Sequence, residues 1–426
     1  MMFYKETNFK ETPIGKIPKE WEVVKVGSDK IAEIRGNKII SDIQKVAFIP
    51  MELVPDQGIF VKYELRDLKD VSSSTYCKAG DLLLAKITPS LENGKQGIVP
   101  EDIPNGFALA TTEVYPIVCK GIDRLFLFYV LKFPRFRKIL EFSMRGTTGR
   151  QRVPKDAVEK LKIPLPSLQE QRKIAEILST VDEAIQKTNE IIAKTERLKK
   201  GLMQELLTSG IGHKEFKDTA IGRIPKEWEV RKLKDVIFEA KSGFACGKRD
   251  ENGILQLRMD SIEPEGWINT EAGVKVPIPE DVENYFLRPG DILFNNTNSV
   301  DLIGKTAIFR GEFQKCVYSN HLTRIRVNLA KAIPEWILYL LIRKWQLGFF
   351  KTICHRHVHQ AGINNEDIIN LKIPVPSISE QKRITLILSS IDEKLRLERN
   401  EKVKLERIKQ GLMDLLLTGK VRVKVN

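Results

Sequence analysis

The chain has few cysteines for its length, five in 426 residues, and the number is odd. They are scattered without the regular spacing of a disulfide framework, so free thiols in a reducing compartment are expected. No uninterrupted apolar run reaches the roughly 18 residues that a membrane-spanning helix requires. The first residues also lack the apolar stretch of a secretory signal peptide. The sequence therefore predicts neither secretion nor membrane insertion, and a cytoplasmic location is expected.

Aromatic residues are also few, at 8%, but hydrophobic residues make up 42% of the chain. That content is ample for sizeable cores in two or three domains. Acidic residues are outnumbered, because 70 Lys and Arg stand against 56 Asp and Glu and leave a net charge of +14. Such an excess favours a polyanionic partner, either nucleic acid or an acidic membrane surface.

The chain contains an internal duplication. IGKIPKEWEV near the start recurs as IGRIPKEWEV after residue 220, identical at nine of ten positions. The segment Leu161–Met203 recurs at Leu371–Met413 with 21 identities in 43 positions, at an offset of 210. Residues 79–99 pair more loosely with residues 289–309. This period is far longer than a solenoid repeat, so each copy is predicted to be a domain followed by a long shared element.

The shared element predicts a long helix in each copy, over 167–208 and 377–418. Each copy begins with a capping box in which a serine hydroxyl accepts hydrogen bonds from amides of the first turn. Gly210 and Gly419 are available as left-handed caps at the other ends. At 1.5 Å per residue, a helix of some 42 residues is about 63 Å long. The capping boxes are Ser167 with Glu170 and Ser377 with Glu380.

Apolar residues recur in steps of three and four along both helices, which is typical of a coiled-coil seam. Two matching seams are best buried against each other, so we expect an antiparallel coiled coil that returns the C-terminal tail to the N-terminus. The first seam is predicted at Leu178, Val181, Ile185, Thr188, Ile192, Thr195, Leu198, Leu202 and Leu206. The second is predicted at Ile384, Leu388, Ile391, Leu395, Leu405, Ile408, Leu412 and Leu416, with Glu398 and Lys402 interrupting it.

The expected fold is mixed α/β, with two globular domains of β-sheets and short helices separated by the helix pair in a pseudo-twofold internal repeat. Runs such as VAFIP, DLLLAKI, ALATTEVYPIV, DILFN and TRIRV predict strands, whereas residues 125–133 and 335–345 predict short buried helices. Trp21 and Trp228 are predicted core anchors. The predicted segments are 1–163 (first globular domain), 164–210 (first long helix), 211–373 (second globular domain) and 374–426 (second long helix and tail).

The positive charge is predicted to lie on the globular domains. The first helix carries seven basic and seven acidic residues and the second nine and seven, so about +12 of the net charge lies elsewhere. Basic surfaces bind phosphates without sequence information, and loops that differ between the two copies are candidates for reading bases. Any single lysine can equally belong to a solvated face, and an Asn-rich loop can be a simple turn.

The candidate DNA-contacting residues are basic or polar and lie in loops at corresponding places in the two copies. In the first copy they are Arg35, Lys38, Lys86, Lys95, Arg145, Thr147, Arg150, Gln151 and Arg152. In the second copy they are Lys241, Lys248, Arg249, Asn295, Asn296, Asn298, Lys305, His321, His355, Arg356, His357, His359 and Gln360.

Three patterns resemble catalytic or metal motifs, and each lacks an essential part. Cys354–His359 contains three of the five histidines, but its spacing matches no zinc motif and the first copy has none of these ligands. Gly304-Lys305-Thr306 resembles the end of a phosphate loop, but Ser299 replaces the first glycine. Two acids and a lysine between residues 56 and 69 fit a loose metal-nuclease pattern that the second copy lacks. The chain itself is therefore expected to be non-catalytic, without a cofactor or metal.

These motifs together resemble the specificity subunit of type I restriction-modification enzymes. Two variable domains are each preceded by IGxIPxxWE and followed by LKIPxPSxxEQ and a long helix ending in GLMxxLL, and the resemblance covers essentially the whole chain. It implies that each domain is a target recognition domain reading one half of a bipartite, asymmetric DNA site through the major groove. The helices would then set the gap between the halves.

The resemblance also implies the partners. Two modification subunits, which hold S-adenosylmethionine, would dock on the helices, and restriction subunits would cleave DNA with ATP and Mg²⁺. Two other hypotheses remain: a single-chain nuclease or methyltransferase with its own recognition domains, and a coiled-coil adaptor whose basic domains bind protein or lipid. Under the specificity-subunit hypothesis, replacing Arg150 or Arg152 alters only the first half-site, and replacing Asn296 or His359 only the second.

Overall fold

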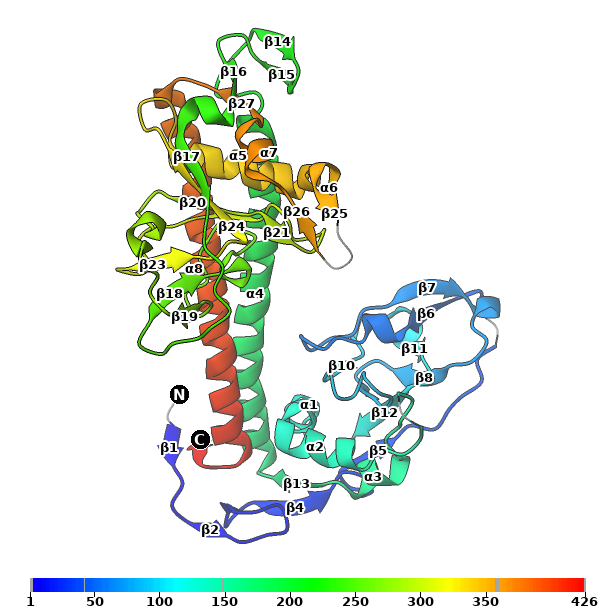
Figure 1. The fold of residues 1–426 in the computed structure, drawn as a ribbon. Helices are drawn as coiled ribbons and strands as arrows, with labels where there is room; N and C mark the ends of the chain where they lie inside the picture. The colour runs from blue at the N-terminus through cyan, green and yellow to red at the C-terminus, as the bar shows by residue number, and fades with distance from the viewer. Residues whose placement is uncertain (1–2, 42, 148, 357–359, 425–426) are drawn as a thin grey trace. The chain divides into compact units, whose positions relative to one another are not determined.

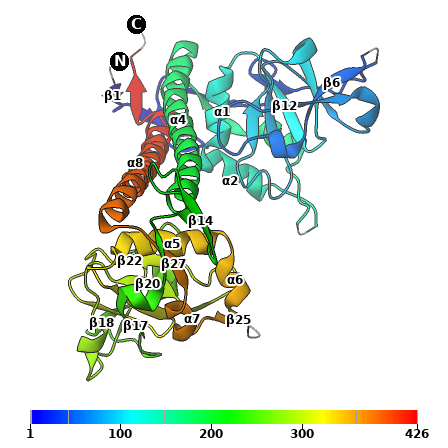
Figure 2. The same cartoon turned by 90° about the horizontal axis from the view of Figure 1, so that it is seen from above.

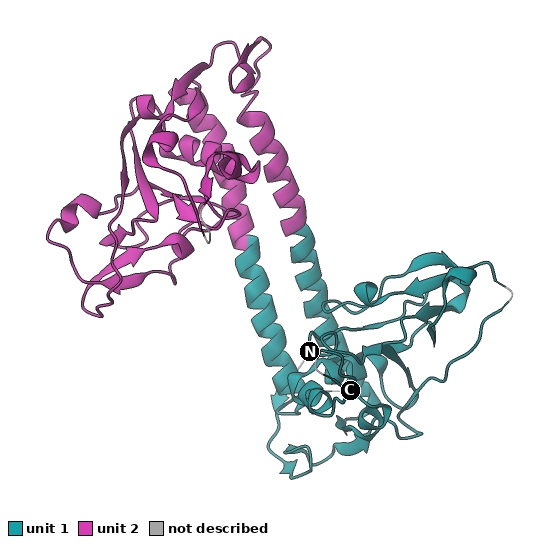
Figure 3. Ribbon diagram, turned by 45° about the vertical axis from the view of Figure 1, so that its right-hand side comes forward, with its two compact units in different colours: residues 1–191, 398–426 teal, residues 192–397 magenta. Residues whose placement is uncertain are grey.

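The computed structural model is a mixed α/β chain with two long helices (Figure 1). It describes residues 3–41, 43–147, 149–356 and 360–424. The chain divides into two compact units, unit 1 with residues 1–191 and 398–426 and unit 2 with residues 192–397 (Figure 3). This division passes through both long helices, so each unit contains one globular domain and a part of each helix. The sequence analysis, in contrast, predicted each long helix as a separate segment.

Two four-stranded sheets form the globular domain of unit 1. The first has the order β10-β9-β12-β5 and is antiparallel, and the second has the order β7-β6-β11-β8 with β6 and β11 parallel. Short helices α1 and α2 share one hydrophobic core with the first sheet. The bounds are β5 (Ala32–Ile34), β6 (Lys45–Ile49), β7 (Glu64–Asp67), β8 (Thr75–Lys78), β9 (Leu82–Ala85), β10 (Gln96–Ile98), β11 (Phe107–Ala110), β12 (Val114–Cys119), α1 (Arg124–Lys132), α2 (Pro134–Phe142) and α3 (Lys155–Lys160).

The globular domain of unit 2 repeats this plan. Its sheet β17-β24-β20-β22 corresponds strand by strand to β5-β12-β9-β10, and β19-β18-β23 again contains one parallel pair, β18 with β23. A small third sheet has the order β21-β26-β25. The bounds are β17 (Ile237–Ser242), β18 (Ile254–Leu257), β19 (Val274–Val276), β20 (Ile292–Asn295), β21 (Thr297–Asn298), β22 (Thr306–Ile308), β23 (Cys316–Tyr318), β24 (Leu322–Val327), α5 (Pro334–Gln346), α6 (Phe349–Ile353), β25 (His355–Arg356), β26 (Ala361–Gly362) and α7 (Asn365–Ile369).

Two-stranded sheets lie where each globular domain meets its long helices. The strand before each long helix pairs with a strand near the start of the same copy, β13 with β4 and β27 with β16. Strand β28 pairs with β1, so the tail returns to the N-terminal strand as predicted (Figure 2). The bounds are β1 (Phe3–Lys5), β2 (Phe9–Lys10), β3 (Ile17–Pro18), β4 (Glu22–Lys25), β13 (Lys162–Leu165), β14 (Phe216–Thr219), β15 (Gly222–Pro225), β16 (Glu229–Lys232), β27 (Lys372–Val375) and β28 (Val421–Val423).

The secondary structure that the sequence predicts is largely confirmed. The five strand-like runs form β6, β9, β11 with β12, β20 and β24, and the two predicted short helices form α1 and α5. The one difference is that ALATTEVYPIV makes two strands in different sheets, because a turn at 111–113 interrupts it. Trp21 and Trp228 are each 1% exposed, which confirms them as core residues.

The two long helices are α4 (Leu168–Leu206) and α8 (Ile378–Leu417), close to the predicted spans. Each begins with the predicted serine cap, in which the hydroxyl accepts a hydrogen bond from the amide three residues later at 3.3 Å. Each is followed by a glycine in the left-handed conformation, Gly210 with φ 66° and Gly419 with φ 70°. No helix within the described part of the chain is both long and apolar enough to cross a membrane.

The glutamate carboxylate of each capping box binds side chains outside its own helix. In unit 1 the Glu170 carboxylate, 1% exposed, accepts from Trp21 Nε1 at 3.1 Å and from Arg422 Nε at 2.6 Å. In unit 2 the Glu380 carboxylate accepts from Trp228 Nε1 at 3.0 Å and lies 2.8 Å from His213 Nε2. The start of each long helix is thus bound to the core tryptophan of its unit and to the segment that follows the other long helix.

Within each unit the two helix segments run antiparallel. In unit 1 Glu170 of α4 pairs with Arg422, which follows α8, and Asp182 pairs with Lys409. The seam differs from the prediction in its second half. Leu198 is 56% exposed and Ile408 is 51% exposed, and the residue that follows each of them, Lys199 or Lys409, faces the partner helix in its place.

Replacing Arg422 with alanine is expected to destabilise unit 1. Its guanidinium binds Glu170, Glu6 and Glu20, and these hydrogen bonds and charges outweigh burial and hold the pKa of Arg422 above its usual value. Removing one partner of a buried ion pair leaves an uncompensated charge and costs about 3–5 kcal/mol. The measurement is the urea unfolding midpoint of the full chain.

The matched control is Arg124→Ala, which removes a guanidinium from the exposed pair with Glu101. Exposed pairs contribute about 0–1 kcal/mol, so its midpoint should stay near that of the unsubstituted chain. Equal midpoints for the two variants would show that the Glu170 cluster contributes little to folding.

Candidate nucleic-acid interface

In unit 1, two of the predicted loops meet in a small ladder beyond the end of β9. Arg145 and Arg152 exchange backbone hydrogen bonds at 2.9 Å and close a hairpin whose described residues are 145–147 and 149–152. Ile87, just after β9, forms a bridge with Arg152, and Thr88 donates its amide to the Gln151 carbonyl at 3.0 Å. The frame of the domain therefore holds this basic hairpin at one place.

The tip of this hairpin is exposed. Arg145, Thr147 and Arg150 are exposed, and Gln151 is half-buried. Arg152, although exposed, makes a two-pronged ion pair with Glu113, at 2.8 Å from Nε and 2.7 Å from Nη2. This pairing raises the pKa of Arg152 and lowers that of the Glu113 carboxyl. Arg152 thus holds the hairpin in place. Among the described residues, the Arg145, Thr147 and Arg150 side chains make no hydrogen bond to the domain.

Unit 2 builds the corresponding hairpin from β25 and β26. Strand β26 lies between β21, which follows β20, and β25, so the Asn-rich loop and the histidine-rich loop meet in one sheet. His355, Arg356 and Gln360 are exposed, and His355 Nε2 lies 3.4 Å from an Asp367 carboxylate oxygen. The predicted contacts His357 and His359 lie outside the described residues.

The Asn-rich segment does not present its side chains as the sequence suggests. Asn295 is 0% exposed, and Asn296, 6% exposed, donates to the Asn320 carbonyl at 3.1 Å and the Thr323 hydroxyl at 2.9 Å. Asn298 is 9% exposed and caps the Ser299 amide at 2.8 Å. The strand pairing of β20 and β21 turns these amides inward, so in this structure they support the sheet and cannot reach a base edge.

Three predicted cations are also bound within their own domain. Lys95 Nζ donates to the Met51 carbonyl at 2.7 Å, and buried Lys305 Nζ donates to the Ile262 carbonyl at 2.7 Å. Arg35 makes a two-pronged ion pair with Asp81, which raises the pKa of the guanidinium. These side chains hold loops in place, so the prediction that they contact DNA is replaced by a supporting role within the domain.

The remaining predicted cations lie at or near the surface. Lys38, Lys248 and Arg249 are exposed, and His321 is half-buried. Lys86 and Lys241 are half-buried with their ammonium groups over tyrosine rings, at 4.8 Å from the Tyr115 centroid and 5.0 Å from the Tyr285 centroid. Burial lowers the pKa of Lys86.

No pattern in the sequence indicated the groups that orient these cations. Glu113, Asp81 and Asp367 lie 39, 46 and 12 residues from the basic side chains they bind, and only the fold brings them together. Within the described residues, which omit His357 and His359 of the Cys354–His359 pattern, no group of three or more His, Cys, Asp or Glu side chains could hold an ion.

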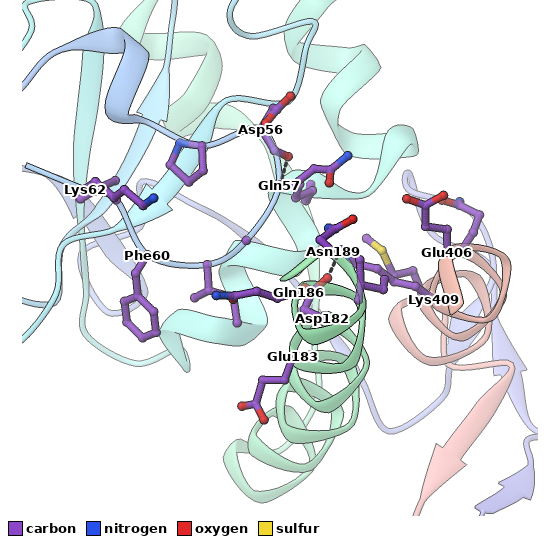
Figure 4. A pocket seen from close by; sticks show the side chains of 18 of the residues that line it. Asp56, Gln57, Phe60, Lys62, Asp182, Glu183, Gln186, Asn189, Glu406 and Lys409 are labelled. Atoms are coloured by element: carbon purple, nitrogen blue, oxygen red, sulfur yellow. Dashed lines mark hydrogen bonds and ion pairs between the residues drawn. The ribbon is translucent and has the colours of Figure 1, made fainter. Parts of the chain in front are cut away.

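A pocket of about 780 Å³ lies in unit 1 between the loop at 52–62 and the two long helices (Figure 4). Its lining includes five carboxylates and three lysines, which does not suit a DNA backbone. Lys132 reaches into this region and donates to the Asp56 carbonyl at 2.5 Å. Burial lowers the pKa of Lys132 to about 8, and the charges of Lys409 and Arg137 act in the same direction.

Lys132 is expected to make stability pH-dependent in the alkaline range. Its folded-state pKa of about 8 lies below the ordinary 10.5, so between these values the unfolded chain keeps a proton that the folded chain has lost. Stability contributed by this group therefore rises with pH across that window. Lys132→Met lacks this titrating group. The free energy of unfolding of the variant minus that of the unsubstituted chain should therefore be largest at pH 7 and fall toward pH 10.5. Urea unfolding midpoints measure the difference.

Lys138→Met, at an exposed position of α2, is the matched control and should show a difference that does not vary in this way. A stability difference for Lys132→Met that stays constant across the pH range would contradict the prediction.

The sequence matches a known family in both of its copies. The family described as "Type I restriction modification DNA specificity domain" matches residues 18–197 and 225–407. The type I restriction enzyme MjaVIII specificity subunit of Methanocaldococcus jannaschii is 33% identical over 100% of this chain and 98% of that protein. A putative MjaX specificity subunit of the same organism is 30% identical over 100% and 99%.

Solved structures share the fold. The type I restriction-modification system S subunit from M. genitalium has a TM-score of 0.60 at 15% identity and covers 97% of this chain and 100% of that one. A chain from work on complex assembly and conformational transition of the type I R-M system has a TM-score of 0.53 at 19% identity, with coverage of 95% and 99%. Because the family matches both copies and the relatives span the full length, the chain belongs to the DNA specificity subunits of type I restriction-modification systems, which recognise DNA sequence.

Proposed function

We propose that each unit carries one target recognition domain and reads one half of a bipartite, asymmetric DNA site through the major groove. The observation that carries this proposal is the hairpin that recurs beyond β9 and β20 on one framework with different side chains. The hairpin of unit 1 offers Arg145, Thr147 and Arg150, and that of unit 2 offers His355 and Arg356. Guanidinium groups read guanine or bind phosphate, and different groups on one frame read different bases.

The helices α4 and α8 are proposed to form an antiparallel coiled coil that separates the two domains in a pseudo-twofold arrangement and sets the gap between half-sites. Two ion pairs support it, Asp182 with Lys409 in unit 1 and Asp392 with Lys199 in unit 2, because their members correspond at an offset of 210. The near-neutral charge of both helices also suits a spacer better than a DNA-binding surface.

The chemistry is proposed to take place on other polypeptides. The relatives are named as specificity subunits of restriction enzymes, which supports a non-catalytic role for this chain within a larger assembly. Two modification subunits holding S-adenosylmethionine would dock on the helix pair, and restriction subunits would supply ATP- and Mg²⁺-dependent cleavage. The assembled complex would then act as an adenine methyltransferase and a site-specific deoxyribonuclease.

Substitutions in the two hairpins should affect different half-sites. With the recognised motif known from the modified adenines of the source genome, Arg150→Ala is expected to weaken binding through the first half only, and Arg356→Ala through the second half only. The expected cost is about 1–3 kcal/mol where the guanidinium reads guanine. Competition binding with duplexes in which one half-site is scrambled measures this.

Lys16→Ala and Lys226→Ala are the matched controls, since each removes an exposed lysine outside the hairpins. They should lower affinity little and equally for both halves. If Arg150→Ala weakened binding equally through both half-sites, the assignment of one hairpin to each half-site would be refuted. The absence of salt-dependent duplex binding would refute DNA recognition by this surface.

A further inference from the structure

Three polar side chains from three elements meet at the junction of unit 1's domain with the helices. The Tyr129 hydroxyl of α1 donates to Asp182 Oδ2 of α4 at 2.8 Å, and Lys409 Nζ of α8 lies 2.5 Å from Asp182 Oδ1. The Asp182 side chain is 9% exposed and that of Lys409 18%. Figure 4 shows Asp182 and Lys409 pointing toward one another from the two helices. Burial and the Asp182 charge raise the pKa of Tyr129, so the phenol stays protonated and donates.

Unit 2 contains the same cluster with the helices exchanged. The Tyr339 hydroxyl of α5 donates to Asp392 Oδ2 of α8 at 2.7 Å, and Lys199 Nζ of α4 lies 2.5 Å from Asp392 Oδ1. The Asp392 and Lys199 side chains are 7% and 9% exposed. Each residue stands 210 positions from its counterpart in unit 1. Tyr339 and Asp392 follow Tyr129 and Asp182 in the chain, whereas Lys199 of the unit 2 cluster precedes Lys409 of the unit 1 cluster.

These charges occupy positions that a stability-optimised seam would give to apolar side chains. Leu198 and Ile408, one residue earlier on each helix, are more than half exposed while Lys199 and Lys409 are turned inward. A buried ion pair contributes little stability compared with apolar packing, because both charges lose their hydration. Polar groups in a seam are best known for selecting one register and orientation. The clusters are therefore better explained as fixing the register and orientation of the two helices than as adding stability.

The spacing of the charges fits only one alignment of the helices. Each helix carries an acid and a base 17 residues apart, about 26 Å along its axis, so an antiparallel pair satisfies both ion pairs at a single register. Sliding one helix by a heptad moves it about 10 Å and parts both pairs at once. A parallel pair in register would place Asp182 against Asp392 and Lys199 against Lys409, which repel.

We propose that the two Tyr-Asp-Lys clusters are positioning groups that set the gap between the DNA half-sites. The ion pairs fix the register of α4 against α8, and the tyrosine hydroxyls fix each recognition domain to the aspartate of that pair. The clusters touch no DNA and act through the placement of the domains. This inference rests on the proposed function, because it concerns how strictly the two recognition domains are spaced.

The test compares binding of the full-length chain to duplexes with the native gap and with one base pair added or removed. The unsubstituted chain should prefer the native gap by about tenfold or more, the scale of a mismatched base pair. Asp182→Asn and Tyr129→Phe should reduce this preference at least about threefold while base preference within each half-site is unchanged. The charge exchange D182K/K409D remakes the ion pair but not the hydrogen bond from Tyr129 to Asp182, so it should keep more of the preference than D182K alone.

Glu176→Gln is the matched control, since Glu176 pairs with Lys173 on the exposed face of the same helix. A second readout needs no DNA: spin labels are attached through keto-bearing residues at exposed Lys69 and Glu271, and the distance distribution between them is measured. The distribution should broaden in Asp182→Asn and Tyr129→Phe, should be narrower in D182K/K409D than in D182K alone, and should not change in Glu176→Gln.

The proposal is overturned if Asp182→Asn and Tyr129→Phe keep both the unsubstituted gap preference and the unsubstituted distance distribution, or if Glu176→Gln changes them equally. A chain that shows no gap preference before substitution would instead refute the proposed bipartite recognition. In that case the label distances still decide whether the clusters position the domains.

Discussion

A carboxylate at the first turn of each long helix, 1% exposed in unit 1 and 13% exposed in unit 2, joins the parts of each unit. Glu170 receives the indole of Trp21 and the guanidinium of Arg422, so one side chain binds the domain core, the start of α4 and the tail beyond α8. Glu380 binds Trp228 and His213 in the same way. A buried charge is tolerated only where donors fully satisfy it. The chain must therefore assemble these distant segments together.

Beyond this junction the two units share a scaffold and differ where they meet solvent. Both contain the same four-stranded antiparallel sheet, the same parallel pair in a second sheet, and a short helix whose tyrosine reaches the long helices. The basic hairpin of unit 1 is replaced in unit 2 by one that carries histidine and arginine. Under the proposed function, a duplicated frame with divergent hairpins lets the two half-sites differ while the helices that space them stay the same.

The cations of the globular domains fall into two groups, those paired with acids of the same domain and those exposed at the hairpins. Several cations are neutralised by partners within the domain, as in the pairs of Arg35 with Asp81 and Arg152 with Glu113. The cations left at the hairpin tips are the ones that can exchange water and counterions for phosphates or base edges. The net charge of +14 therefore overstates the number of side chains that are free to contact DNA.

The sequence by itself determined the duplication, the long helices with their caps, most strands, and the family, because these depend on local periodicity, capping residues and identities between copies. It also predicted that the candidate DNA-contacting loops lie in corresponding pairs. Only the tertiary structure decided which side chains are available, because strand pairing turned Asn295 and Asn296 inward and supplied acidic partners from remote segments. The same holds for the seam. A helical period does not show whether Ile408 or Lys409 faces the partner helix, and Lys409 faces it because it pairs with the Asp182 carboxylate. Burial and pairing are properties of neighbours in space, and these neighbours are far apart in the chain.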